Sequence, residues 1–154
     1  MPMIVGIDPG CSGALVLIGS MGGYIDHLNM PTIKVGTKSR VNGAAVAAWL
    51  RQYDVGHAYL EQVGAMPGQG TASMFTFGHA AGVAEGILQG LSIPYTLVTP
   101  QDWKKSAGLI GSDKDAARSR AIQLFPELRA LDAKAKGQAI ADALLIARHG
   151  IGMK

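Results

Sequence analysis

The stretch Ile4-Val-Gly-Ile-Asp-Pro-Gly-Cys-Ser-Gly13 decides how this sequence folds. Its apolar start ends in one carboxylate, Asp8, which is followed by a Pro-Gly turn and a second apolar run, Ala14–Ile18. Short apolar runs that are rich in Val and Ile and bounded by turn residues predict buried strands. Because an unpaired charge at the end of a buried strand is costly, we expect Asp8 to face a cation.

The composition is that of a folded chain. Of the 154 residues, 48% are hydrophobic and 16% are charged, which excludes a disordered chain, and we expect a single domain over residues 1–154. No apolar run is long enough to span a membrane, and the N-terminus lacks the basic start and cleavage site of a signal peptide. The single cysteine, Cys11, cannot form an internal disulfide. These features predict a cytoplasmic protein with no membrane association.

The order of the expected elements predicts an α/β domain. A third strand follows over residues 24–30, and the polar, basic segment 31–42 is expected to be a loop. The later elements are, in order, a helix over 43–53 capped by Asn42, a strand over 57–61, a helix over 73–91, a strand over 94–98, a short helix over 100–105 capped by Thr99, a helix from 112 or 113 to about 125, and a helix over 138–149. We therefore expect a mixed five-stranded sheet, three antiparallel strands and then parallel ones, flanked by helices.

Three acids stand out because their neighbours are apolar. Asp8 and Glu61 each end a predicted strand, and Asp142 lies on the inward face of the last predicted helix. Alone, each acid has an ordinary explanation as a helix cap or as the partner of a basic residue. Together they would repel one another unless a hard divalent cation such as Mg²⁺ or Mn²⁺ held them. Two such ions about 4 Å apart are a known device for attack of water on a phosphodiester.

These motifs resemble RuvC-type Holliday-junction resolvases. The shared features are Gly-Ile-Asp-Pro-Gly-x-Ser-Gly around Asp8, the acid Glu61 at a strand end, and the helix Ala-Asp-Ala-Leu-Leu-Ile-Ala around Asp142. The segments 61–70, 73–78 and 99–105 are most similar to the small phage and bacterial members. The similarity runs from about residue 3 to residue 149. It implies a ribonuclease-H-like fold and a homodimeric endonuclease that nicks four-way (Holliday) or branched DNA junctions, leaving 5′-phosphate and 3′-hydroxyl ends.

The resemblance also implies a set of active-site residues. Asp8, Glu61 and Asp142 correspond to metal-binding, catalytic carboxylates for Mg²⁺, with Mn²⁺ as a substitute and two ions in each site. The family usually has a fourth acid or histidine a few positions before the last acid, and this chain has none there. Gln138 or Asp132 are the candidates to replace it, and a weakened or lost activity is the alternative.

Candidate DNA contacts come from basic clusters and from a mobile, glycine-rich loop over residues 63–71. The formal net charge is +3, and the basic residues gather near the ends of predicted elements. The aromatic rings after the loop are expected either to stack on opened bases or to pack in the core of the helix. The predicted DNA contacts are Gln69, Phe75, Phe77, Lys104, Lys105, Lys114 and Arg118.

Further interpretations stay open from the sequence. Glycines 78, 82, 86 and 90 recur every fourth residue, so one stripe of the expected 73–91 helix permits close approach of the sheet, a second subunit or DNA. Among possible dimer contacts, we expect the one on this helix. An actin-like or sugar-kinase-like phosphate loop also begins with a strand, an Asp and a Gly-rich turn, but those proteins close two such domains on a nucleotide. A DNA-binding module without catalysis would keep the basic clusters and tolerate an incomplete acid set.

Overall fold

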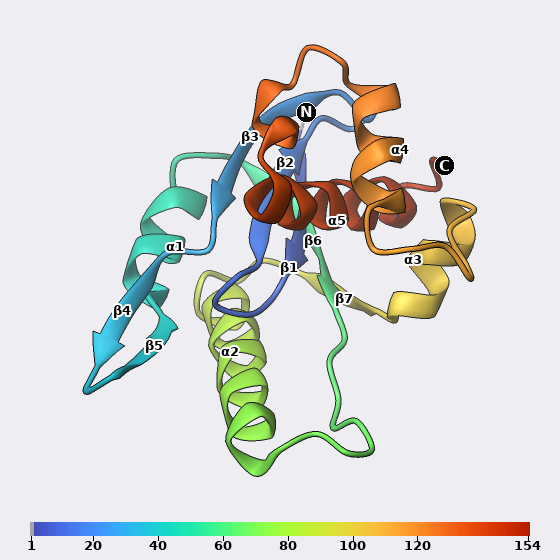
Figure 1. Cartoon of the computed structure of the whole chain (residues 1–154). Helices are drawn as coiled ribbons and strands as arrows, with labels where there is room; N and C mark the ends of the chain where they lie inside the picture. Colours follow the sequence, from blue (N-terminus) through green and yellow to red (C-terminus); the bar gives the residue numbers. More distant parts are fainter. Residues whose placement is uncertain (1) are drawn as a thin grey trace.

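The central strand of the fold is the one that ends in Asp8. In the computed structural model, which describes residues 2–154, the five-stranded sheet has the order β3-β2-β1-β6-β7 (Figure 1). The pairs β1–β2 and β2–β3 are antiparallel, whereas β1–β6 and β6–β7 are parallel, so the predicted mixed sheet is confirmed. The strands are β1 (Met3–Asp8), β2 (Ala14–Ile18), β3 (Tyr24–Asn29), β6 (Val55–Glu61) and β7 (Tyr95–Val98).

Helices cover both faces of this sheet. On one face α5 (Lys134–Gly150) lies across β1 and β2, together with α3 (Pro100–Ser106), α4 (Ala116–Leu124) and the short 3₁₀ helix η1 (Arg129–Asp132). The other face carries α1 (Gly43–Leu50) and α2 (Thr71–Gly90). Each face has its own buried apolar cluster, as the two-residue alternation of strand side chains requires.

The contact between α5 and β1 depends on Gly6. A Cβ atom at this position would overlap the backbone of Ala143 and Ala147 in α5. Because only glycine permits this approach, the helix lies directly on the strand that carries Asp8. The helix that carries Asp142 is thereby held at a fixed depth over the sheet.

Two predicted helix caps are confirmed. Asn42 accepts a hydrogen bond from the Ala45 N–H with its side-chain oxygen at 3.2 Å, at the start of α1. Thr99 accepts one from the Asp102 N–H at 3.2 Å, with proline at the first position of α3. Side-chain oxygens at these positions satisfy backbone N–H groups that have no partner inside the helix.

The prediction of a structureless loop over residues 31–42 is wrong. The segment forms a second, two-stranded sheet, β4 (Thr32–Val35) paired antiparallel with β5 (Lys38–Val41). Gly36 has a φ of +64° in the two-residue turn between them, which suits a tight hairpin. The alternation of polar and apolar residues in β4 covers only four positions, and all four residues are exposed, so this strand has no buried face and the pattern is too short to identify it.

Several bounds of predicted helices and strands also differ: α1 ends at residue 50 rather than 53, β6 begins at residue 55 rather than 57, and α2 begins at residue 71 rather than 73. α5 begins at residue 134 rather than 138, because its first turn is polar and exposed and gives no apolar signal. α4 begins at residue 116 rather than after 112 or 113, because the Asp113 carboxylate accepts from the Asp115 N–H at 3.1 Å and holds a turn before the helix. No helix among residues 2–154 is both long enough and apolar enough to cross a bilayer.

Candidate active site

Strand alternation turns Asp8 and Glu61 toward the same side of the sheet. Val5 and Ile7 of β1 pack in the cluster beneath α1 and α2, so Asp8 faces the opposite side, beneath α5. In β6, Leu60 packs with the same α1–α2 cluster, so Glu61 also faces α5. The parallel register sets Ile7 beside Leu60, which places the two acids side by side at the carboxyl ends of neighbouring strands.

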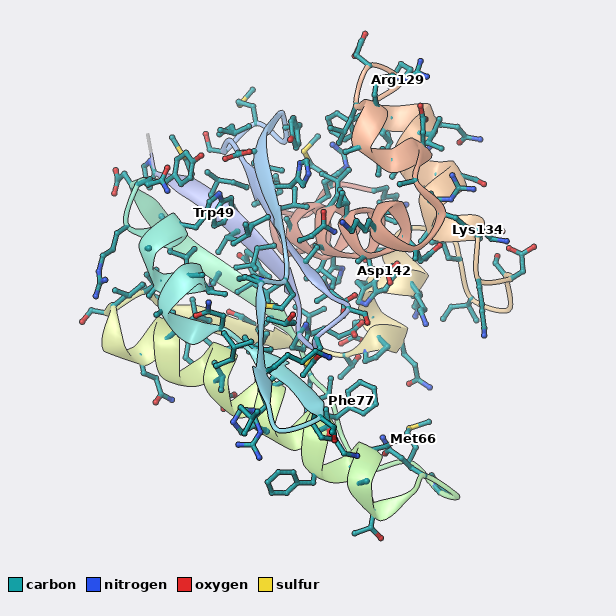
Figure 2. All side chains as sticks on the ribbon, turned by 60° about the vertical axis from the view of Figure 1, so that its left-hand side comes forward. Trp49, Met66, Phe77, Arg129, Lys134 and Asp142 are labelled. Carbon is teal, nitrogen blue, oxygen red and sulfur yellow. The ribbon has the colours of Figure 1, made fainter. Side chains whose placement is uncertain are left out.

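Asp142 reaches this place from α5. It precedes Ala143, the residue whose carbonyl meets Gly6, so the helix presents it to the end of β1. Figure 2 shows Asp142 near the middle of α5, on the side of the helix that faces Phe77 and Met66. All three acids are partly buried. The structure therefore brings together the three carboxylates that the sequence singled out.

Burial raises the pKa of all three acids, and neighbouring carboxylates raise that of Asp8 and Asp142 further. Burial raises the pKa of Asp8 to about 8, and the negative charges of Glu61 and Asp142 add to this, whereas Lys104 opposes it. Burial and the charge of Glu61 raise the pKa of Asp142 to about 7, against a hydrogen bond from Gln138 and the charge of Lys104. Burial also raises the pKa of Glu61, with Trp103 and Lys104 acting in the opposite direction. Such a cluster is short of positive charge.

Trp103 is a site residue that sequence reasoning assigned only to packing. Its indole Nε1–H donates to the Glu61 carboxylate at 2.6 Å, while its ring is 1% exposed in the core beneath α5. A buried tryptophan usually finds a partner for its N–H, and here that partner is a candidate metal ligand. Its place in the fourth position of a short capped helix gave no signal of this role.

Gln138 lies one helical turn before Asp142 and contacts it. Its Nε2 donates to the Asp142 carboxylate at 3.1 Å, while its Oε1 is buried and has no hydrogen-bond partner among the described residues. An unpaired buried amide oxygen is costly unless something else meets it. Asp132, the other candidate for a fourth ligand, is instead paired with Arg129 at 2.7 Å on η1.

The donor chemistry of this cluster fits a hard divalent cation. Three carboxylates with raised pKa values and an unpaired amide oxygen are oxygen donors of the kind that Mg²⁺ and Mn²⁺ prefer. Among residues 2–154, no group of three or more His, Cys, Asp or Glu side chains is arranged closely enough to hold a metal ion. The acids thus form an electrostatic cluster rather than a closed ligand cage.

Two cavities open on either side of the acids. One, of about 460 Å³, is lined by Asp8, the turn that follows it, Lys38 and the start of α2 with Phe77. The other, of about 390 Å³, is lined by Asp142, Gln138, Lys104 and the segment 109–114 before α4, which includes Lys114. A strand that passes over the acids would therefore meet lysines on both sides.

The remaining predicted DNA contacts lie in different surroundings. The core alternative for the two phenylalanines is excluded, since Phe75 is 64% and Phe77 47% exposed. In Figure 2 Phe77 points from α2 toward the end of the sheet where Asp142 lies. Lys105 is exposed on α3. The Gln69 Oε1 accepts from the Met66 N–H at 3.1 Å, within its own loop.

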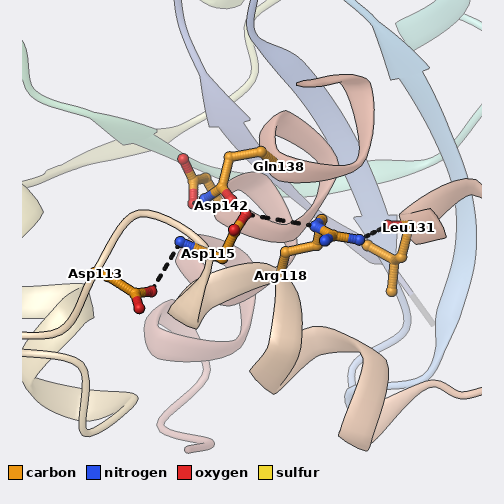
Figure 3. A network of polar contacts seen from close by, with 6 residues as sticks. All are labelled: Asp113, Asp115, Arg118, Leu131, Gln138 and Asp142. Carbon is orange, nitrogen blue, oxygen red and sulfur yellow. Dashed lines mark hydrogen bonds and ion pairs between the residues drawn. The ribbon is translucent and has the colours of Figure 1, made fainter. Parts of the chain in front are cut away.

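Arg118 is engaged inside the protein. Its guanidinium donates to the Leu131 carbonyl at 3.2 Å and lies 3.8 Å from the Asp115 carboxylate (Figure 3). Its Nε is buried without a hydrogen-bond partner among residues 2–154. Arg118 thus joins α4 to η1, next to the turn of α5 that carries Gln138.

Comparison with known proteins agrees with this geometry. The sequence profile described as Crossover junction endodeoxyribonuclease RuvC matches residues 4–149. The chain belongs to the RuvC family. A curated relative, the chloroplastic Holliday junction resolvase MOC1 of Chlamydomonas reinhardtii, is 32% identical over 97 residues, which make up 62% of this chain and 11% of that protein. The chain thus spans about a tenth of the length of that relative.

Solved structures show the same fold. The RuvC of T. thermophilus in complex with a Holliday junction substrate has a TM-score of 0.56 and 16% identity, over 96% of this chain and 91% of that one. A second Thermus thermophilus RuvC structure has a TM-score of 0.60 and 16% identity, over 96% and 92%. The predicted ribonuclease-H-like fold of the RuvC family is confirmed.

Proposed function

We propose that this chain resolves four-way DNA junctions by divalent-metal-dependent hydrolysis of a phosphodiester in each of two strands, leaving 5′-phosphate and 3′-hydroxyl ends. The observation that carries the proposal is the convergence of Asp8, Glu61 and Asp142, with raised pKa values, in a chain that belongs to the RuvC family. The proposal includes the small phage or bacterial branch and a cytoplasmic location, which the sequence predicted.

The three carboxylates would hold Mg²⁺, with Mn²⁺ as a substitute and two ions in each site, and the unpaired Oε1 of Gln138 would contribute a neutral oxygen. When bound, such ions lower the pKa of water and stabilise charge on the phosphate oxygens. Trp103 fixes the orientation of Glu61 through its N–H, and Gln138 does the same for Asp142. These contacts hold two of the acids in place before substrate arrives.

The positive charge of Lys104 lowers the pKa of all three acids and so opposes the effect of their burial. Its ammonium also lies 5.5 Å from the centre of the Trp103 ring. We place it at the phosphate that is cut, where a fixed positive charge stabilises negative charge on oxygen. Lys105 and Lys114 would then contact neighbouring phosphates, which position DNA without reading its sequence.

A four-way junction needs two matched cuts, and a homodimer supplies two sites. A side chain added at Gly78, Gly82, Gly86 or Gly90 would meet no atom within 4 Å, so this face of α2 is open within the described chain. We place the subunit contact there. Gly82→Leu should make the protein monomeric in sedimentation experiments, and it cannot act by weakening the helix, because leucine has the higher helix propensity.

A junction-binding module with weak or no cleavage is the second candidate. Two observations favour it. Within residues 2–154 the acids are not arranged closely enough to hold a metal ion. One helical turn before Asp142 the chain has an amide, Gln138, rather than an acid. The two candidates differ in whether a bound junction is cut.

Cleavage of a labelled four-way junction decides between them. With Mg²⁺ or Mn²⁺ the wild-type protein should give paired nicks, and Asp8→Asn should bind the junction without cutting it. The matched control is Asp54→Asn, which changes an exposed acid before β6 and should cut at the wild-type rate. Binding without nicks under either ion would establish the binding module, and neither binding nor nicks would overturn both candidates.

A further inference from the structure

A third cavity, a groove, lies between the β4–β5 hairpin and the start of α2. It has a volume of about 570 Å³, within the range of small-molecule sites. We call it the hairpin groove. The residues of its lining that matter here are Lys38, Ser39, Arg40, Phe75, Thr76 and His79.

Phe75 forms an aromatic platform in this groove. Phe75 is 64% exposed, so it is not part of the hydrophobic core, where phenylalanine is most often found. His79, one turn further along α2, stacks with it at 6.5 Å between ring centres and an interplanar angle of 27°. The Arg40 guanidinium lies over the Phe75 ring at 5.8 Å from its centre. A flat ring flanked by a cation is the arrangement that unpaired bases stack on.

The charge of the groove favours a polyanion. Arg40 and Lys38 line it, none of its lining residues within the described chain is an acid, and no carboxylate of residues 2–154 pairs with Arg40. A second copy of this chain carries a net charge of +3 and is a poorer match than a nucleic acid strand. The guanidinium and the Ser39 hydroxyl supply hydrogen-bonding atoms for the edge of a base.

The hairpin groove continues into the cavity beside Asp8. The linings of the two share Cys11, Lys38, Ala72 and Thr76. The two cavities therefore adjoin, and a strand whose phosphate lies at the acids could also reach the hairpin groove. Phe75 and Phe77 are two residues apart on α2 and so point to different sides of it, Phe75 into the hairpin groove and Phe77 into the cavity at Asp8.

We propose that the hairpin groove is a nucleobase subsite, which takes one unpaired base of the strand that is cut, stacked on Phe75 and read at its edge by Arg40. The subsite rests on the proposed function, and it assigns the choice of cleavage sequence to the hairpin. Because arginine presents paired N–H donors that match O6 and N7 of guanine, guanine is the base we expect it to prefer.

The test uses the Asp8→Asn protein and four-way junctions with 2-aminopurine at one position at a time near the crossover. At one position, binding should change the fluorescence at least about two-fold, because stacking on the Phe75 ring changes the surroundings of the base. Phe75→Ala should abolish the change, and Phe75→Trp should retain it. Met21→Ala, which removes an 85% exposed side chain in the turn between β2 and β3, is the matched control.

Cleavage rates with each of the four bases at that position give the second readout. The wild-type protein should discriminate among them, and Arg40→Ala should reduce the ratio of best to worst rate by about five-fold or more, whereas Arg51→Ala at the end of α1 should not. The subsite is overturned if Phe75→Ala keeps both the fluorescence change and the preference, or if Phe75→Ala converts a dimeric protein to monomers, which would make the groove a subunit contact. Failure of the wild-type protein to bind or nick any junction would instead overturn the proposed function.

Discussion

The two flanks of the acid cluster are lined by different kinds of side chain. Beside α5, the cavity at Asp142 is lined by Lys104 and Lys114, and its tryptophan ring, Trp103, is buried. On the other side, the hairpin and the start of α2 expose aromatic rings, with Arg40 over one of them. The first flank suits phosphates, which all sequences share, and the second suits bases, which differ. We therefore propose that one flank holds the DNA strand and the other reads its bases.

Removal of a single charge from the acids between the flanks should have the largest effect on cleavage. Asp142→Asn keeps the shape of the side chain and removes one charge from the cluster. We expect cleavage of a four-way junction to fall by about 10³-fold or more, because catalytic groups that act as a unit fail together. Binding of the junction should change little. Cleavage within about ten-fold of wild type would show that Asp142 is not a ligand.

Loss of the Trp103 N–H should have the next largest effect. Trp103→Phe keeps an aromatic ring in the core but leaves the Glu61 carboxylate without its donor. Contacts that orient metal ligands typically contribute about 10- to 100-fold in metal affinity or activity, and we expect a loss in that range, partly restored by excess Mn²⁺. Trp49→Phe is the matched control, since Trp49 donates to Asp26, at 3.2 Å, away from the acids. Equal losses of activity in both variants would show that the effect comes from changed packing and not from the lost hydrogen bond to Glu61.

The phosphate flank should respond uniformly across DNA sequences. Lys114→Ala should weaken junction binding a few-fold for every sequence and lower the slope of log affinity against log salt by about 1. Filter binding at several salt concentrations measures both. A change that depends on the base sequence would contradict the division between the two flanks.

The smallest predicted effect is on stability without metal. The folded protein holds a proton on Asp8 up to about pH 8 and on Asp142 up to about pH 7, whereas an unfolded chain loses both at about pH 4. The folded state therefore binds more protons in this window, so its stability falls as pH rises from about 4 to 8. In EDTA, Tm should drop by at least about 5 °C between pH 5.5 and 8.5. The Tm of Asp8→Asn should fall by less over the same pH range. A wild-type Tm that does not change with pH would contradict the raised pKa values.

The sequence predicts the central sheet and its acids better than the hairpin and the side-chain contacts around them. Asp8, Glu61 and Asp142 are visible in the sequence because an acid inside an apolar run is a local anomaly, and strand alternation with one helix contact brings them together. The β4–β5 hairpin was missed because an exposed strand has no buried face to mark it. The roles of Trp103 and Arg40 depend on partners 42 and 35 residues away, which no local pattern records.

The most direct test of the account is titration of the protein with Mn²⁺ in the absence of DNA, by calorimetry at pH 7.5. If the three carboxylates act as one metal site, the wild-type protein should bind with release of protons, because the cation displaces those held by the raised pKa values. Asp8→Asn should lose this binding by about ten-fold or more, and Asp54→Asn should retain it. Equal binding by wild type and Asp8→Asn would contradict the claim that these acids form the catalytic centre.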